Sequence, residues 1–330
     1  MNSRHRLFFI IAGVAFVVLA IADIAAGSVA VPMRDVVAAL TGGDVDPVTR
    51  TIVVDFRLLK AVVAIAAGAA LSAAGLEMQT LFRNPLAGPY VLGISSGASL
   101  GVAILLLGAS MFPALHAAGS SLGIAGAAWI GAATILAIVT TLGHRVKDIM
   151  VILIIGMMIS SAIGAVVQIL QYAGNEESLK NFVIWTMGSL GEVTRSQLWI
   201  LLAAVVIGLA MALIASKQLN LLLLGEEYAL TMGLNLRQSR LLILLSTTLL
   251  AGTVTAFCGP IGFIGLAVSH LSRALIADSD HRALMPATIL TGSTVMLACD
   301  LVSKMFVLPI NAITSLVGIP VVIAVVLKRR

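Results

Sequence analysis

The chain has 330 residues, of which 60% are hydrophobic and only 11% are charged, whereas about 25% of residues are charged in a typical soluble domain. So few charged side chains cannot cover a soluble protein of this size, so the composition excludes a soluble globular domain and indicates a polytopic α-helical membrane protein. The net charge of +5 comes from Lys and Arg that are dispersed between apolar runs without forming a basic tract, so we expect no nucleic-acid partner.

The first apolar run, residues 7–27, follows two Arg residues. A signal peptide has a similar basic start, but its apolar region is only about 7 to 15 residues long, so we expect an uncleaved first helix. Residues 28–60 come next and contain a predicted short helix near Pro32 to Leu40, a Gly-Gly-Asp turn and a second short segment that ends at Lys60. We expect this segment to be an outward-facing cap.

Apolar stretches of roughly 17 to 25 residues, long enough for a helix to cross membrane lipid, recur along the chain. The ten candidates are residues 7–27, 61–82, 91–107, 120–142, 149–172, 198–215, 241–258, 261–277, 284–306 and 310–327. With the N-terminus inside, thirteen of the 20 Lys and Arg fall on the inner side and seven on the outer side. Because cytoplasmic loops are enriched in Lys and Arg, this bias predicts that both termini are cytoplasmic and that residues 1–330 form one transmembrane domain.

Residues 216–240 form an inner loop with two predicted short amphipathic helices, Leu219 to Leu224 and Glu226 to Met232. Such a segment can present a helix to a cytoplasmic partner. The alternative is an interfacial helix that rests on lipid headgroups.

The sequence lacks the motifs of common membrane enzymes. No Gly-Lys dipeptide occurs, so a phosphate-binding loop of the Walker type is absent, and no His is followed by Glu, so the zinc-protease motif is absent too. Cys258 and Cys299 lie in apolar runs, where we expect buried small hydrophobes rather than a disulfide or a metal site. We therefore predict no catalytic residue, no metal site and no cofactor in this chain.

A G-x-S-x-G sequence at residues 93–97 matches the nucleophile elbow of hydrolases, but here it opens an apolar helix. Gly93, Gly97 and Gly101 are spaced four residues apart, so they share one helix face that another helix can approach closely. We expect these glycines and Ser95 to have a packing role.

Three carboxylates, Asp23, Glu77 and Asp300, fall inside predicted spans. Intramembrane acids often form ion relays, so an ion-coupled secondary transporter is one hypothesis. Against it, the three acids lie on spans one, two and nine without a partner acid nearby in the sequence. Glu77 is only a turn or two from Arg83 and within reach of pairing with it.

Four blocks of sequence point to a more specific interpretation. They are Gly68 to Ala98, which contains Arg83-Asn84-Pro85-Leu86-Ala87-Gly88-Pro89; Leu219 to Arg240, which contains Leu219-Asn220 and Leu224-Gly225-Glu226; Gly259 to Arg282, which ends with Asp280-His281-Arg282; and Gly318-Ile319-Pro320 before a basic tail. Together they closely resemble the permease subunits of binding-protein-dependent ABC importers for iron-siderophores, haem and cobalamin. The blocks occur in the order of that family and cover the chain from about residue 52 to its end.

The resemblance implies an all-α, type II ABC importer permease fold with ten transmembrane helices in a bacterial inner membrane. It also implies a dimer of two permease copies, most simply a homodimer, two separate ATP-binding subunits that hold ATP and Mg, and a periplasmic substrate-binding protein. The chain itself would not be an enzyme. A membrane scaffold that binds an ATPase but transports nothing is the remaining alternative.

In the family, the loop between spans two and three lies at the cytoplasmic gate. Pro85 cannot continue a helix and forces an irregular backbone there. We expect Asn84 and Leu86 to be gate residues, with Met150 at the inner end of span five as a third. The alternative is that the loop is only a tight cytosolic turn.

The resemblance also assigns two docking faces. The predicted ATPase-coupling residues are Leu221, Gly225, Glu226, Ala229 and Gly233. On the outer side, Arg57-Leu58-Leu59-Lys60 resembles the family's Arg-Leu-Pro-Arg motif, whose cations bind acidic residues of the binding protein, and Lys304 takes the place of a third cation. Lys60 lacks the bidentate fork of Arg, so a more salt-sensitive contact is expected, and ordinary snorkelling cations are the alternative.

The substrate is left open by the sequence. A path lined by small and apolar side chains suits a bulky ligand, and ferric siderophore, haem and cobalamin all meet that description. We expect specificity to reside in the separate binding protein.

Overall fold

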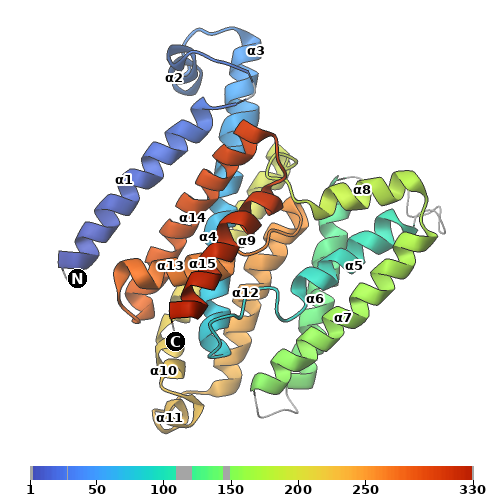
Figure 1. Ribbon diagram of the computed structural model, residues 1–330, viewed down its shortest axis with the longest axis vertical. Helices are drawn as coiled ribbons and strands as arrows, with labels where there is room; N and C mark the ends of the chain where they lie inside the picture. The colour runs from blue at the N-terminus through green and yellow to red at the C-terminus, as the bar shows by residue number, and fades with distance from the viewer. Residues whose placement is uncertain (1–2, 28, 109–120, 144–148, 329–330) are drawn as a thin grey trace.

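The computed structural model describes residues 3–27, 29–108, 121–143 and 149–328, and all regular structure in these ranges is helical. The helices are α1 (Ser3–Ala25), α2 (Met33–Thr41), α3 (Pro47–Arg50), the π-helix η1 (Thr51–Leu58), α4 (Leu59–Leu81), α5 (Ile94–Leu106), α6 (Ser121–Gly143), α7 (Ile149–Ala173), α8 (Glu176–Thr186), α9 (Arg195–Ile214), α10 (Ser216–Leu223), α11 (Glu226–Thr231), α12 (Leu236–Cys258), α13 (Ile264–Ile276), α14 (His281–Phe306) and α15 (Ile310–Lys328). They form an elongated bundle with α2 and α3 at one end and α10 and α11 at the other (Figure 1). The two long predicted segments, 28–60 and 216–240, therefore lie at opposite ends.

Helix α4 lies at the centre of the bundle, where it contacts α9, α12, α13 and α14. Every residue from Ala66 to Leu81 is buried. This part of α4 is rich in Ala and Gly, and small side chains let several helices approach one another closely inside a membrane.

Two pairs of glycines bring α4 into backbone contact with its neighbours. A side-chain carbon added at Gly68 would overlap the backbone of Gly292 on α14, and one added at Gly75 would overlap the backbone of Gly265 on α13. Neither contact has room for a methyl group. These close approaches fix how α13 and α14 lie on the central helix.

The predicted glycine face of the third span is confirmed. A carbon added at Gly97 or Gly101 would meet the backbone of α6, and one added at Gly93 would meet α7 at Ser160. Ser95 lies in the first turn of α5, and a loop, not a strand, precedes it. The nucleophile-elbow geometry is therefore absent.

All ten predicted spans contain helices, but two of these helices, α5 and α13, are shorter than predicted. In the described residues, seven helices are long and apolar enough to cross a membrane, and the other three predicted positions hold α5, α13 and α15. Helices α5 and α13 have 13 residues each, and a helix of that size is only about 20 Å long, compared with about 30 Å for the hydrocarbon core. The predictions for 91–107 and 261–277 began too early because the preceding loops are also apolar.

The cap differs from its prediction in one respect. Helix α2 matches the predicted short helix, and its Val36 and Ala39 cluster with Val53 of η1. The second short segment is not separate, because α3, η1 and α4 form one continuous helical stretch of 35 residues from Pro47 to Leu81. At about 50 Å this stretch is longer than the bilayer core is thick, and it projects beyond the other helices (Figure 1).

The close approach between α4 and α13 can be tested with a single methyl group. Gly75→Ala should destabilise the protein by about 1–3 kcal/mol, because the Gly265 backbone occupies the space that the methyl group needs. Gly126→Ala on α6 is the matched control, since nothing lies within 4 Å of an added carbon there. Thermal unfolding of the purified protein in detergent measures both variants. Equal melting temperatures for Gly75→Ala and Gly126→Ala would contradict the contact.

Candidate functional site

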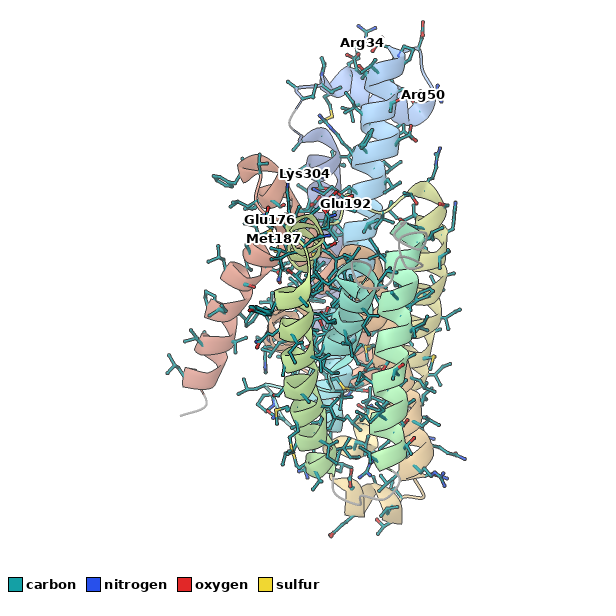
Figure 2. The ribbon with its side chains drawn as sticks, turned by 90° about the vertical axis from the view of Figure 1, so that its right-hand side faces the viewer. Arg34, Arg50, Glu176, Met187, Glu192 and Lys304 are labelled. Atoms are coloured by element: carbon teal, nitrogen blue, oxygen red, sulfur yellow. The ribbon has the colours of Figure 1, made fainter. Side chains whose placement is uncertain are left out.

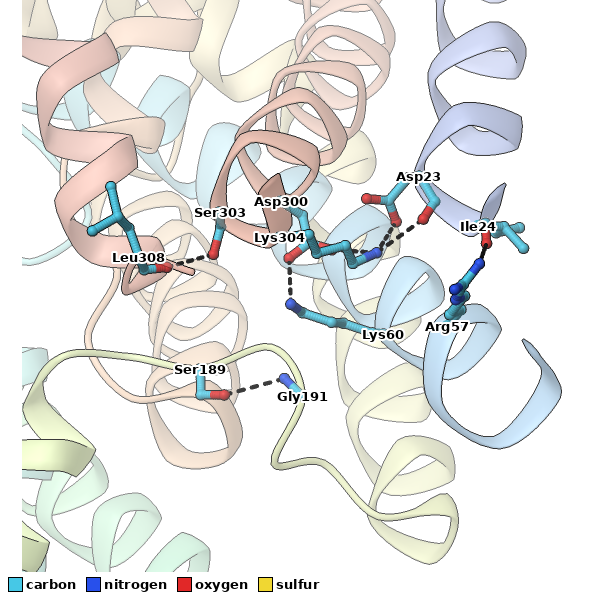
Figure 3. Close-up of polar contacts among 10 residues, drawn as sticks. All are labelled: Asp23, Ile24, Arg57, Lys60, Ser189, Gly191, Asp300, Ser303, Lys304 and Leu308. Carbon is cyan, nitrogen blue, oxygen red and sulfur yellow. Dashed lines mark hydrogen bonds and ion pairs between the residues drawn. The ribbon is translucent and has the colours of Figure 1, made fainter. Parts of the chain in front are cut away.

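Four charged side chains meet near the cap, where α1, α4 and α14 come together. Lys304 Nζ lies 2.7 Å from Asp23 Oδ2 and 2.8 Å from Asp300 Oδ2, and Lys60 Nζ lies 3.0 Å from Asp300 Oδ1 (Figure 3). Both carboxylates are fully buried. Two ammonium groups balance them, which offsets the large cost of burying a charge. The fold thus brings together two acids, on spans one and nine, that have no partner acid nearby in the sequence.

Arg57 lies on η1 and holds the end of α1. Its Nη1 donates to the carbonyl of Ile24 at 3.2 Å (Figure 3). Nη1 also donates to the carbonyl of Ala25 at 2.6 Å, and Nη2 donates to the carbonyl of Val29. A cation at the C-terminus of a helix satisfies unpaired carbonyls and interacts favourably with the helix dipole. Only 5% of Arg57 is exposed. In the isolated chain this guanidinium therefore has a structural function.

The three predicted docking cations lie at the cap end, and each has internal partners. Lys60 is the more accessible of the two lysines, with 25% of its side chain exposed compared with 9% for Lys304. Both line a hollow of about 330 Å³ together with Asp300 and Ser303. An acidic group of a partner could reach both ammonium groups there, but it would compete with Asp300. Docking at these cations stays a prediction.

Two other cations at the cap end, Arg34 and Arg50, are more exposed than Arg57, Lys60 and Lys304. Arg34 and Arg50 project at the tip of the cap, whereas Lys304 lies lower, at the level of Glu176 and Glu192 (Figure 2). Neither arginine belongs to a sequence motif, so neither was predicted as a docking residue. Their exposure makes them further candidates for a contact at this end.

The predicted gate residues Asn84 and Leu86 lie in the loop of residues 82–93, here called the gate loop, which begins directly after α4. Arg83 ends the helix with a left-handed φ of 47°. Asn84 N donates to the carbonyl of Gln79 at 3.1 Å, and Asn84 Oδ1 accepts from the backbone N of Leu86 at 2.9 Å. The Asn84 side chain therefore shapes the turn, while Leu86 keeps 47% of its surface exposed.

Helix α13 braces this loop. His270 Nε2 lies 2.7 Å from the carbonyl of Pro85. The side chain of Gln79 in α4 donates to the carbonyl of Leu266 at 3.2 Å and accepts from Arg273 Nη1 at 2.8 Å. His270 and Arg273 belong to the family-like block Gly259 to Arg282, but no function was predicted for either residue.

A hollow of about 870 Å³ lies between the start of the gate loop, α7 and the α10–α11 segment. Its lining residues are Phe82, Arg83, Ile149, Met150, Leu224, Gly225, Glu226, Glu227, Tyr228 and Thr231. Met150, a predicted gate residue, thus faces the same space as the predicted coupling residues Gly225 and Glu226. Asn84 and Leu86 are not among the lining residues. The structure brings together one predicted gate residue and two predicted coupling residues that lie more than 70 positions apart in the sequence.

The predicted coupling residues differ in their surroundings. Gly225 precedes α11 with a φ of 105°, and Gly233 follows it with a φ of 81°, so both occupy conformations that favour glycine. Ala229 is fully buried, and Leu221 is half-buried. Glu226 accepts bonds of 2.6 and 2.7 Å from Arg240 Nη2 of α12. These residues set the shape of the segment.

The same segment carries a group of exposed apolar side chains. They are Leu223, Leu224, Tyr228, Leu230 and Met232, each at least 39% exposed, and Leu224 and Tyr228 also line the hollow. Exposed apolar side chains gathered on one short segment are typical of a surface that meets either a partner protein or lipid.

Glu77 does not pair with Arg83, so that expectation is wrong. Its Oε2 accepts from Ser246 Oγ at 3.0 Å and from Thr247 Oγ1 at 2.9 Å, both on α12. Arg83 turns away because the chain leaves the helical path there, and it lines the hollow instead.

The intramembrane acids do not form one relay in the structure. Asp23 and Asp300 share Lys304, while Glu77 contacts hydroxyl groups elsewhere in the bundle. Within the described part of the chain, no group of three or more His, Cys, Asp or Glu could hold a metal ion.

Comparison with known proteins gives consistent matches. Residues 15–328 match the FecCD transport family, which extends the resemblance almost to the N-terminus. The hemin transport system permease protein HmuU of Yersinia pestis is 38% identical over 84% of this chain and 83% of its own length. The vitamin B12 import system permease protein BtuC of Klebsiella pneumoniae is 36% identical over 83% of this chain and 82% of its own.

Two further matches broaden this set. The molybdate import system permease protein MolB of Haemophilus influenzae is 30% identical over 88% of this chain and 85% of its own length. A solved structure of an inward-facing conformation of a metal-chelate type ABC transporter superposes with a TM-score of 0.84 at 29% identity, covering 98% of this chain and 99% of the other.

The charge cluster near the cap gives a stability prediction. Lys304→Met should destabilise the protein by about 3–5 kcal/mol, because Asp23 and Asp300 would lose the cation that they share. Lys180→Met, at an exposed position on α8, is the control and should have little effect. Melting temperatures in detergent give the comparison. Adding Asp23→Asn to Lys304→Met should restore part of the loss, and no restoration would argue against the shared cation.

Proposed function

The chain belongs to the FecCD transport family and is an ABC importer permease, and from this premise we propose that it moves a metal chelate into the cytoplasm. The chelate would be an iron-siderophore or a related metallated macrocycle such as haem or cobalamin. Permeases of this family are inner-membrane proteins that work with an ATPase and a substrate-binding protein. In this proposal, two ATP-binding subunits hold ATP and Mg, and the chain itself is not catalytic.

One observation carries the proposed mechanism: the hollow of about 870 Å³ has the start of the gate loop on one side and the α10–α11 segment on the other. A partner ATPase that docks on the exposed apolar side chains of this segment and changes shape would displace α11. Because residues of α11 and Arg83 line the same hollow, this displacement would directly alter the surroundings of the gate loop. Rigid-body shifts of packed helices are a common way to transmit such a movement.

We propose that α10 and α11 face the cytoplasm and that the cap faces the periplasm. The excess of Lys and Arg in the predicted inner loops, thirteen compared with seven, supports this orientation, in which both termini are inside. The binding protein would then deliver its ligand at the cap end, near Arg57, Lys60 and Lys304. A second copy of the chain would complete the path.

The uncharged lining of a second hollow beside the gate loop supports a ligand with an organic surface. A hollow of about 170 Å³ between the gate loop and the start of α13 is lined by residues such as Pro89, Tyr90, Ile261 and Phe263. None of its lining side chains is charged. A small oxyanion needs cations or N–H donors along its way, whereas a large chelate with an organic surface can pass apolar walls without being held.

Reconstitution tests this function directly. Liposomes that contain the permease and its ATPase, with the binding protein added outside, should take up the chelate that the binding protein binds, and only with hydrolysable ATP. A non-hydrolysable ATP analogue is the control. Uptake without the ATPase, or collapse of uptake when a proton uncoupler is added while ATP remains, would favour an ion-coupled transporter instead. ATPase binding without any uptake would indicate a scaffold.

The proposed ATPase surface predicts the effect of a single charge. Tyr228→Asp should weaken binding of the ATPase by about tenfold or more, because Tyr228 is 53% exposed in the apolar group and lines the hollow. Val48→Asp, at a position on the cap that is 65% exposed, is the matched control. Co-purification with the ATPase at a series of concentrations gives the affinities. Equal affinities for the two variants would place the docking surface elsewhere.

A further inference from the structure

Two sequence blocks meet inside the structure, at residues to which the proposed function gives no role. Asn220, on α10, comes from the first block, and Asp280 and His281, at the start of α14, come from the second. Asn220 Nδ2 donates to Asp280 Oδ1 at 2.6 Å, and Asn220 Oδ1 accepts from the backbone N of His281 at 2.8 Å. These two bonds fix the orientation of the amide, because its N and O face partners of opposite kind.

The imidazole ring of His281 extends this contact into the bundle. Its Nδ1 lies 2.9 Å from Asn220 Oδ1, and its Nε2 lies 2.8 Å from Thr80 Oγ1 on α4. An amide oxygen only accepts, so Nδ1 carries the hydrogen, and in the neutral ring Nε2 accepts from the Thr80 hydroxyl. His281 is fully buried and Thr80 is 2% exposed. Away from water, both bonds are costly to break.

Thr80 lies in the last turn of α4, next to the gate loop. Its carbonyl accepts from the backbone N of Arg83 at 3.2 Å, and the carbonyl of Gln79 accepts from the backbone N of Asn84 at 3.1 Å. A continuous series of bonds therefore runs from α10 through the His281 ring to the turn that starts the loop. It joins Asn220 to His281, which are 61 positions apart in the sequence, and His281 to Thr80, which are 201 positions apart.

We propose that Asn220, His281 and Thr80 form a relay that transmits movement of α10 to the gate loop, with His281 as a positioning residue for transport. This inference rests on the proposed function. A planar ring held at both nitrogens transmits displacement better than apolar contacts, which allow sliding. If the ATPase moves α10, the end of α4 either follows or leaves buried polar groups unpaired, and the second outcome is unfavourable.

The test removes one hydroxyl at the α4 end of the relay. Thr80→Val keeps the shape of the side chain but cannot donate to His281. In proteoliposomes with the ATPase and binding protein, ATP hydrolysis should stay within about twofold of wild type, while uptake per ATP should fall about tenfold, as expected for loss of one buried hydrogen bond. Thr80→Ser should retain wild-type uptake per ATP.

Two matched variants separate transmission from stability. Thr291 lies in α14, the helix that His281 begins, and its buried hydroxyl bonds only to the Ala287 carbonyl of the same helix at 2.8 Å. Thr291→Val removes this hydroxyl and should leave uptake per ATP unchanged. Asn220→Ala cuts the other end of the relay. Combined with Thr80→Val it should cause no further loss, because either change alone breaks the series.

A second readout follows the gate itself. With Leu86→Cys as a reporter, ATP should change the rate of labelling by a water-soluble maleimide in the wild-type background but not with Thr80→Val. Unchanged uptake per ATP in Thr80→Val, or a parallel fall in hydrolysis, uptake and melting temperature, would overturn the relay. A wild-type complex that transports nothing would instead overturn the proposed function, and the relay with it.

Discussion

The fold depends on the close packing of α4. This helix is buried along its C-terminal two thirds and contacts its neighbours backbone to backbone at Gly68 and Gly75. Such contacts allow little sliding, because no side chain separates the helices. Both candidate functional regions are attached to this one helix. Lys60 lies in its first turn, near the cap, and Thr80 lies in its last turn, beside the gate loop. The central helix is therefore the rigid element that relates the two ends.

The polar groups inside the bundle are used to hold helices together. Lys304 joins α1 to α14 through Asp23 and Asp300, and Glu77 joins α4 to α12. Asp23 and Asp300 have a cationic partner that offsets the cost of taking them out of water, and Glu77 accepts hydrogen bonds from two hydroxyl groups. This arrangement explains why intramembrane acids that suggest an ion relay in the sequence have a structural function in the bundle.

The sequence predicted the positions of the spans and of the two extramembrane segments, because hydropathy and charge bias are local properties. It did not predict where α5 and α13 begin, since the loops before them are as apolar as the helices. Nor did it predict that Asn220, His281 and Thr80 meet. Contacts between residues far apart in the sequence depend on how helices pack, and a single sequence does not encode that in a readable pattern. The resemblance placed all three residues in motif blocks, and the structure supplies the geometry that connects them.

In the proposed mechanism, ATP binding to the partner ATPase moves the gate loop that follows α4. A pulsed EPR distance between spin labels at Leu86 in this loop and at Ile130 on α6 tests it most directly, because both side chains are exposed, at 47% and 71%. The account predicts that the distance distribution shifts when ATP binds to the complex and stays unchanged when the ATPase is absent. An identical distribution with and without ATP in a complex that transports its ligand would contradict the account.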